Sequence, residues 1–346
     1  MASKPSKVTQ REIAEIAGVS QSTVSMVLND RDGASVRIPE ATRARVRQAI
    51  EQSTYVADPA ARRLAGLDNQ IIGVFTYEAA LSPESMDFYG PLLNGIERAA
   101  ERAGCDLLFF TSSPVEDGSR RLFHKNTRLR LADGCILLGQ RMDGDDLARL
   151  VDEQFPFVAV GRRDETAAKV PYVGLDYVTP TTALIERAAQ LGHERAVYVH
   201  HDLTSPAADD RMAAVRAADA AGVLQFDYLR EADLAAVVDA VGAATVVFAE
   251  DSFLAEDVIH TLSKSGISAP GDLSVASLAE VRGHRVGDHA LTGFHVPREQ
   301  VAVEALALLQ QLVSSSAEED WPQLDTQRLL SAEVEFGATL VERRAQ

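Results

Sequence analysis

From residue 70 onward, short apolar runs alternate with segments that carry the 3.6-residue period of a helix. The runs that predict strands are IIGVFTY (71–77), CDLLFFT (105–111), GCILLG (134–139), FVAVG (157–161), RAVYVH (195–200), ATVVFA (244–249) and DLSVASL (272–278). Helices are predicted near 88–103, 144–154, 179–191, 209–221, 251–265 and 298–313. Continuous apolar runs suit parallel strands that are buried on both faces. The alternation therefore predicts doubly wound parallel sheets with helices on both sides.

The chain of 346 residues is too long for one ordinary hydrophobic core. We expect the α/β region, residues 70–346, to form two lobes with a cleft between them. In open α/β sheets the loops at the carboxyl ends of the strands line such a cleft, and ligands bind there.

The first residues show a different pattern, which is helical. Thr9 and Glu12 have the spacing of a capping box, and Ile13, Ile16 and Ala17 form an apolar stripe. Gly18 can end this helix in a left-handed turn. Two short helices joined by a glycine turn predict a helix-turn-helix; the alternative is a helical hairpin that binds no DNA.

Ser20 can cap the second helix, whose apolar residues are Val24, Val27 and Leu28. The residues on the opposite face are Gln21, Ser22, Ser25 and Met26. In a helix-turn-helix the start of the second helix enters the major groove, so Gln21, Ser22 and Met26 are the candidate base-reading residues. Glutamine can bind adenine through two hydrogen bonds, and an apolar side chain can contact a thymine methyl group.

A third helix is predicted after Pro39, with Arg43, Arg45 and Arg47 facing mostly outward toward phosphates or toward solvent. The next segment, DPAARRLAGL, has a capping Asp58 and a terminating Gly66. A helix of seven residues is unstable alone in water and needs a partner surface. That partner is a DNA minor groove, with Leu64 as an apolar wedge, or the segment is a plain linker.

Charge is distributed unevenly along the chain, whose net charge is −17. Residues 1–66 contain 10 lysines and arginines against 7 acidic residues, a balance of +3, and the remainder contains 24 against 44, a balance of −20. An acidic body repels DNA, so the small basic head is expected to make any DNA contact.

Several classes of protein are not expected. The segment MASKPSKVTQ lacks the apolar core of a signal peptide, and no apolar run approaches the length of a membrane helix. Cys105 and Cys135 suit buried thiols in a reducing cytosol better than a redox pair. The eight histidines form no zinc motif, and there is neither a nucleophile elbow nor a phosphate-binding loop. We expect no enzyme, no metal and no cofactor.

The stretches VTQREIAEIAGVSQSTVSMVLND, YVADPAARRLAG and IIGVF resemble the lactose-repressor/galactose-repressor family of bacterial transcription regulators. The resemblance implies a helix-turn-helix domain at 1–57, a hinge helix and linker at 58–69, and an effector-binding and dimerisation domain at 70–346. It implies that Met26 stands where the family commonly has arginine. The implied DNA-binding residues are Lys7, Thr9, Ser20, Gln21, Ser22, Thr23, Ser25, Met26, Asn29, Ala61, Leu64 and Ala65.

The resemblance extends to FYGPLLNGIERAAERAGCDLL, LIERAAQLGHERAVYV, KSGISAPGDLSVASL and LTGFHVPREQVAVEAL. It implies an effector domain that is similar to periplasmic binding proteins. The implied lobe 1 is about 70–168 plus 297–326, and lobe 2 is 169–296 plus 327–346. The implied ligand-binding residues are Tyr77, Phe88, Tyr89, Arg141, Asp176, Arg211, Glu250 and Glu280.

Three of these positions have a purely structural alternative: a helix salt bridge for Arg211, and core packing for Phe88 and Tyr89. Glu250-Asp251 replaces the family's usual Asn-Asp, and Ala279-Glu280 replaces Asp-Asp. The lost aspartate removes an acceptor for neutral sugars, and the added glutamate favours an amine-bearing ligand over an anion. The expected effector is therefore a small polar molecule, sugar-like or amine-bearing.

The sequence predicts a cytoplasmic, nucleoid-associated transcriptional regulator, a ligand-controlled repressor that binds a palindromic operator in double-stranded DNA. A homodimer is expected because GATLVERRAQ carries no heptad repeat of the kind the family's tetramers use. One alternative is a regulator whose cleft is vestigial and which a protein partner or its own abundance controls. Another is a small-solute-binding protein.

Overall fold

The computed structural model describes residues 8–28, 38–53, 69–116, 119–125, 127–202, 205–241, 243–315, 317 and 320–343. Two compact units, residues 1–69 and 70–346, divide the chain. The predicted hinge helix and five predicted DNA-binding residues lie outside the described residues: Lys7, Asn29, Ala61, Leu64 and Ala65.

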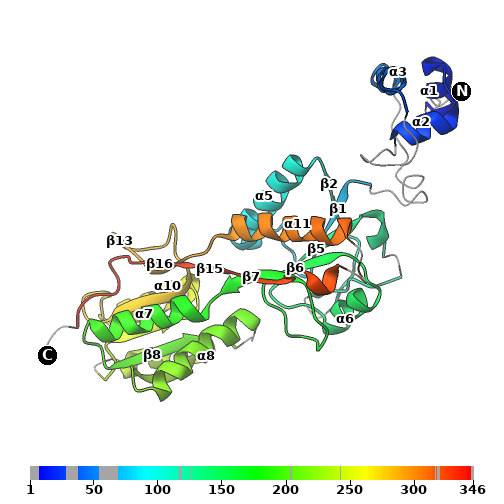
Figure 1. Cartoon of the computed structure of the whole chain (residues 1–346). Helices are drawn as coiled ribbons and strands as arrows, with labels where there is room; N and C mark the ends of the chain where they lie inside the picture. The colour runs from blue at the N-terminus through cyan, green and yellow to red at the C-terminus, as the bar shows by residue number, and fades with distance from the viewer. Residues whose placement is uncertain are drawn as a thin grey trace, which may run out of the picture. The chain divides into compact units, whose positions relative to one another are not determined.

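The head unit contains α1 (Gln10–Ala17), α2 (Gln21–Leu28) and α3 (Glu40–Glu51) (Figure 1). Thr9 and Glu12 form the predicted capping box, and Gly18 ends α1 with a φ of 64°, which a side chain would disfavour. The small core of this unit is made of Ile13, Ala14, Ala17, Val24, Val46 and Ala49. The predicted place of Ile16 in the apolar stripe is wrong: its side chain is 61% exposed, and Ala14 packs in the core instead.

Lobe 1 of the second unit is built on a parallel sheet with the strand order β15-β7-β6-β5-β1-β2. These strands span Gln327–Ser331, Tyr172–Asp176, Phe157–Val160, Gly134–Leu138, Ile71–Thr76 and Asp106–Phe109. Helices α5 (Met86–Ala103) and α11 (Arg298–Ser314) pack against one face through a core that contains Ile72 and Val74. Helix α6 (Gly144–Asp152) covers the other face, where Phe75 and Leu137 meet Leu147.

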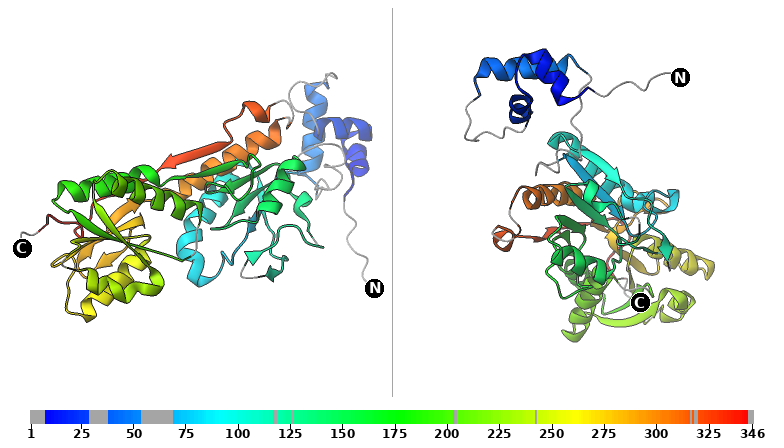
Figure 2. Two further views of the ribbon diagram at one scale, coloured as in Figure 1. Left: turned by 90° about the horizontal axis from the view of Figure 1, so that it is seen from below. Right: turned by 90° about the vertical axis from the view of Figure 1, so that its right-hand side faces the viewer.

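Lobe 2 is built on a second sheet with the order β16-β14-β11-β10-β8-β9, in which only β16 runs antiparallel to its neighbour. These strands span Glu333–Glu335, Thr292–His295, Ser274–Glu280, Val246–Ala249, Arg195–His200 and Gln225–Arg230. Helices α7 (Val178–Gln190) and α8 (Pro206–Ala220) cover one face, and α10 (Ser252–Lys264) covers the other (Figure 2).

Short elements complete the fold. They are 3-10 turns at Pro83–Ser85, Leu129–Leu131, Glu231–Ala236 and Trp321–Gln323, the helix α9 (Val237–Ala240), and strand pairs Val115–Glu116 with Ser119–Arg120 and Arg285–Val286 with His289–Ala290.

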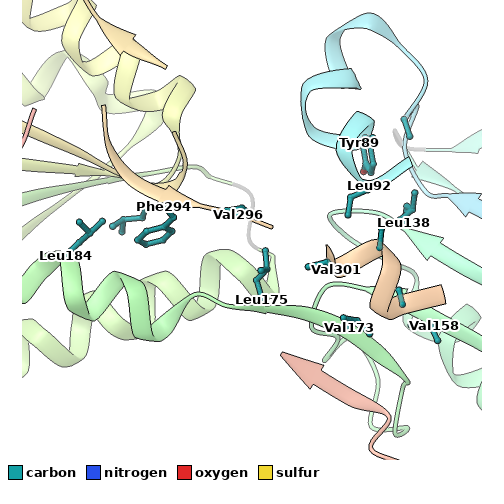
Figure 3. Packing of buried hydrophobic residues seen from close by; sticks show 14 of the residues in the cluster. Tyr89, Leu92, Leu138, Val158, Val173, Leu175, Leu184, Phe294, Val296 and Val301 are labelled. Atoms are coloured by element: carbon teal, nitrogen blue, oxygen red, sulfur yellow. The ribbon is translucent and has the colours of Figure 1, made fainter. Parts of the chain in front are cut away.

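The predicted boundaries between the lobes need a correction. Strands β7 (Tyr172–Asp176) and β15 (Gln327–Ser331) belong to the first sheet, although residues 169–176 and 327–331 were assigned to lobe 2. The reason is strand pairing, because β7 joins β6 and then holds β15. The chain therefore crosses between lobes after Asp176, between His295 and Arg298, and after Ser331. Leu175 lies near the end of β7, just before the first of these crossings, and Val296 lies on the second (Figure 3).

Candidate functional site

The recognition face of the head is formed by α2. Gln21 and Ser22 are exposed, Met26 is 38% exposed, and Val24 on the opposite side is fully buried. Ser20 caps the helix by accepting a hydrogen bond from the Thr23 backbone N–H at 3.1 Å. Ser25 is half-buried beside these residues. The exposed surface of α2 thus carries an amide, hydroxyl groups and one apolar side chain, which suit the edges of bases.

Two of the three arginines of α3 are placed where they can meet a phosphate. Arg45 and Arg47 are exposed, although Arg47 also lies 3.9 Å from Glu40. Arg43 is half-buried, and its Nε donates to the Ile38 carbonyl at 3.3 Å, so its predicted outward position is only partly correct.

In the second unit, the predicted ligand residues lie at or just after strand ends of the two sheets or on helices α5 and α8, and we call the region around these strand ends the interlobe edge. Arg211 on α8 is only 8% exposed. Its Nε donates to the Leu278 carbonyl of β11 at 2.6 Å, and its guanidinium lies 4.1 Å from the centre of the Tyr177 ring. Nη1 of Arg211 is 4.0 Å from Oε1 of Glu250, which follows β10. Arg211 and Glu250 are therefore a buried, oppositely charged pair.

Glu250 is also connected to a histidine that the sequence analysis did not select. The backbone N–H of His201 donates to Glu250 Oε2 at 3.0 Å. The His201 ring bonds Asp251 at 2.6 Å and Glu231 at 2.7 Å. The hydrogen bond to Asp251 is the main cause that raises the pKa of His201 to about 9, with burial opposing it. Burial raises the pKa of Glu250, and the charge of Arg211 partly offsets that effect.

Asp176 is the last residue of β7, at the first crossing between the lobes. Its Oδ1 accepts the backbone N–H groups of Val178 and Thr179 at 3.0 and 3.1 Å, and so holds the first turn of α7. Tyr177, the next residue, supplies the aromatic face beneath Arg211. Sequence reasoning selected Asp176 but missed Tyr177.

The predicted aromatic pair lies in lobe 1. Phe88 is 36% exposed and meets Tyr89 edge to face with ring centres 4.9 Å apart, while Tyr89 is buried. Tyr89 donates its hydroxyl to Glu78, which also accepts the backbone N–H of Gln140 at 3.1 Å and that of Arg141 at 3.4 Å. The Arg141 side chain is exposed. The sequence prediction did not include Glu78. Its position directly after the predicted strand that ends at Tyr77 is the only sequence signal that could have indicated a residue of the site.

Glu280 joins the two lobes. Its Oε1 accepts the Arg282 N–H and its Oε2 accepts the Val296 N–H, both at 2.9 Å. Arg298, at the start of α11 in lobe 1, lies 3.7 Å from the same carboxylate and 5.1 Å from the centre of the Phe88 ring. Both oxygens of Glu280 are thus engaged at a crossing segment, a structural role that the sequence prediction did not include.

Tyr77 differs from the other predicted ligand residues because it is part of the hydrophobic core of lobe 1 on the face that α6 covers. It is fully buried in lobe 1 with Phe75, and its hydroxyl lies 3.5 Å from Asp146 of α6. Burial raises its pKa. Alternate residues near the end of β1 point to opposite faces of the sheet, and Tyr77 points to the face that α6 covers. Tyr77 therefore packs in the core of lobe 1, which is a structural role that the sequence prediction did not include.

Among the described residues, no cluster of three histidine, cysteine or carboxylate side chains is arranged to hold a metal ion. No helix in the part of the chain that the structure describes is long and apolar enough to span a bilayer.

Two family models match the chain. Residues 9–58 match "Bacterial regulatory proteins, lacI family", and residues 185–340 match "Periplasmic binding protein-like domain". A sucrose operon repressor of Klebsiella pneumoniae is 32% identical over 187 residues, which is 54% of this chain and 53% of that protein. The transcriptional regulator CelR of Thermobifida fusca is 25% identical over 331 residues, or 90% of this chain and 93% of that protein.

The fold is shared with a crystal structure of the lac repressor dimer bound to operator and the anti-inducer ONPF. The TM-score is 0.71 at 19% identity, and the match covers 97% of this chain and 100% of that chain. A helix-turn-helix head followed by a two-lobed binding-protein fold defines a DNA-binding transcription regulator and not an enzyme. Residues 9–58 are thus a helix-turn-helix domain of the lacI family, the same chain carries a periplasmic-binding-protein-like domain, and its relatives are transcription regulators.

Proposed function

We propose that the chain is a repressor that binds a palindromic operator as a homodimer and that a small polar molecule controls it from the interlobe edge. Its place of action is the nucleoid. The observation that carries the ligand part of this proposal is the buried pair of Arg211, on α8, and Glu250, after β10.

The head supports the DNA part of the proposal. Its recognition face is polar and exposed, and the exposed Arg45 and Arg47 of α3 can make sequence-independent phosphate contacts. The remainder of the chain has a balance of −20, so the head is the part that DNA attracts. A protein with one such head gains specificity by docking two heads on a two-fold symmetric site.

The ligand part rests on the gap between Arg211 and Glu250. At 4.0 Å, Nη1 and Oε1 are too far apart for a direct hydrogen bond. A ligand hydroxyl placed between them can accept a hydrogen bond from the guanidinium and donate one to the carboxylate. The charge of Glu250 repels an anion. A protonated amine has no lone pair with which to accept a hydrogen bond from Arg211. A neutral polyhydroxylated ligand therefore fits better than the amine-bearing one.

The experiment combines thermal unfolding with operator release across a panel of glucose, sucrose, cellobiose, glycerol, spermidine and adenosine. A hydroxylated compound should raise the melting temperature and change operator affinity. Glu250→Gln keeps an acceptor at this position and is expected to keep the response with lower affinity, while Arg211→Met is expected to abolish it. If a responding ligand binds Arg211→Met with wild-type affinity, Arg211 is not the anchor. If no compound shifts either measurement, control by a protein partner or by abundance becomes the better account.

A further inference from the structure

Three hydroxyl groups form a cluster at the start of the recognition helix, with Ser20 in the middle. Ser20 Oγ lies 2.7 Å from Ser22 Oγ and 2.8 Å from Thr23 Oγ1, and it accepts the Thr23 backbone N–H at 3.1 Å. Ser22 was a candidate base-reading residue, and this cluster changes what its side chain can contribute.

The number of protons and lone pairs in the cluster determines whether Ser22 can offer DNA a hydrogen-bond donor or an acceptor. A serine hydroxyl has one proton and two lone pairs. One lone pair of Ser20 accepts the Thr23 N–H, so its proton and its second lone pair remain for the two neighbouring hydroxyls, one in each direction. In one arrangement Ser22 donates to Ser20 and presents a lone pair outward. In the other it accepts from Ser20 and presents its proton outward.

The two arrangements differ only in the rotation of three hydroxyl groups. Ser22 can therefore meet either a donor or an acceptor on a base edge, and its contact does not discriminate between base pairs. Its bond to Ser20 also holds it close to the capping residue at the first turn of α2. Ser22 acts as a positioning residue for this turn.

The side chains that can discriminate between base pairs are then the two at the edges of the exposed face of α2. Gln21 is exposed at the beginning of α2, and Met26 is 38% exposed more than one turn later. At about 100° per residue they lie about 140° apart, with Ser22 and Ser25 between them. This separation directs the two side chains to different base pairs.

We propose that Gln21 and Met26 each select an A·T pair in the half-site and that Ser22 only positions the helix that carries them. The glutamine amide can donate to N7 and accept from N6 of adenine, and the thioether side chain of Met26 can cover a thymine methyl group. The one amide nitrogen of Gln21 cannot span O6 and N7 of guanine as an arginine fork does, and Met26 offers no donor, so G·C pairs at these two positions are disfavoured. The inference rests on the proposed binding of an operator.

The inference is tested by selecting bound sequences from a library of random DNA duplexes, with the full chain and with a set of variants. The wild-type motif should have two positions per half-site that are occupied by A·T. Gln21→Glu should change one of them toward C·G and Met26→Arg the other toward G·C, each by roughly tenfold in relative affinity. Gln48→Glu makes the same change of charge on the exposed surface of α3, and its motif should be that of the wild type.

The positioning role of Ser22 has its own readout. Ser22→Ala and Ser20→Ala should lower affinity for all duplexes alike and leave the base preferences unchanged, and Ser22→Thr should restore affinity. A loss of preference at a single position in Ser22→Ala would show that Ser22 reads a base, and the inference would be wrong. A clear motif with G·C at the two responding positions would also overturn it while leaving operator binding intact. Absence of any motif for the wild type would instead overturn the proposed function and the inference together.

Discussion

Arg162 and Asp210 form an ion pair at 3.0 Å that joins the two lobes. Arg162 follows β6 in lobe 1, and Asp210 lies on α8 of lobe 2, next to Arg211. Arg162 Nη2 also donates to the Pro206 carbonyl in the first turn of α8, at 2.9 Å. Both side chains of the pair are mostly buried, at 24% and 19% exposure. Arg162 thereby holds lobe 1 to the helix that carries the candidate ligand residue.

Replacing Arg162 by methionine should lower the free energy of unfolding of the second unit by about 1–2 kcal/mol, because a hydrogen bond and an ion pair at a partly buried site are lost. Urea unfolding followed by circular dichroism measures the change. Arg195→Met is the matched control, since Arg195 pairs with Asp227 at 3.2 Å but both side chains are about half exposed. The control should lose less than about 0.5 kcal/mol. Equal losses of unfolding free energy in the two variants would show that the ion pair between the lobes stabilises the unit no more than an exposed pair does.

Arg211 and Glu250 should show strong energetic coupling. Arg211→Met leaves the Glu250 carboxylate buried without its cation, which should cost about 3 kcal/mol of folding free energy. The double variant Arg211→Met/Glu250→Gln removes that uncompensated charge and should recover a large part of the loss. Unfolding curves of the wild type, both single variants and the double variant give the coupling energy. Additive losses would mean that the two side chains do not interact, despite their 4.0 Å separation.

His201 should make the protein less stable as pH rises. Its pKa is raised to about 9 from an ordinary 6.5, so its contribution to stability is fully present below about pH 6.5 and is lost as pH rises through 9. The loss should be about 1–2 kcal/mol, which is less than the full pKa shift allows because 30% of the side chain meets solvent. Unfolding measured at pH 6.5 and pH 9 provides the test.

The variant His201→Gln should show a flatter dependence on pH over the same interval. His260→Gln is the control, because His260 is exposed on α10. If the wild type and His201→Gln lost the same stability between the two pH values, another group would be responsible.

Leu64 lies outside the described residues, and the prediction for it rests on the sequence. If the segment 59–65 orders on the operator and Leu64 enters the minor groove, Leu64→Ser should weaken specific binding roughly tenfold or more. Non-specific binding should change little, because the phosphate contacts of Arg45 and Arg47 remain. Competition titrations with operator and random duplex separate the two effects. Leu67→Ser, beyond Gly66, is the matched control, and a similar loss on both duplexes would contradict the wedge.

The sequence by itself determined the elements of this protein. The runs at 71–77, 134–139 and 244–249 each contain a strand, and the capping pair Thr9–Glu12 and the turn at Gly18 mark the ends of α1. Periodicity, caps and glycine turns depend on neighbours within a few residues, so they can be read from one chain. Together with the resemblance, they were enough to predict the class of protein and its two-lobed fold.

Tertiary structure decided which distant residues meet. The sequence alone did not indicate that β7 and β15 join the first sheet or that Arg162 reaches Asp210. Nor did it indicate that Tyr77 faces α6. Each of these contacts joins residues that are tens to more than a hundred positions apart. Strand pairing and helix packing bring these residues together. The register of a strand determines which of its side chains face the interlobe edge and which face the core.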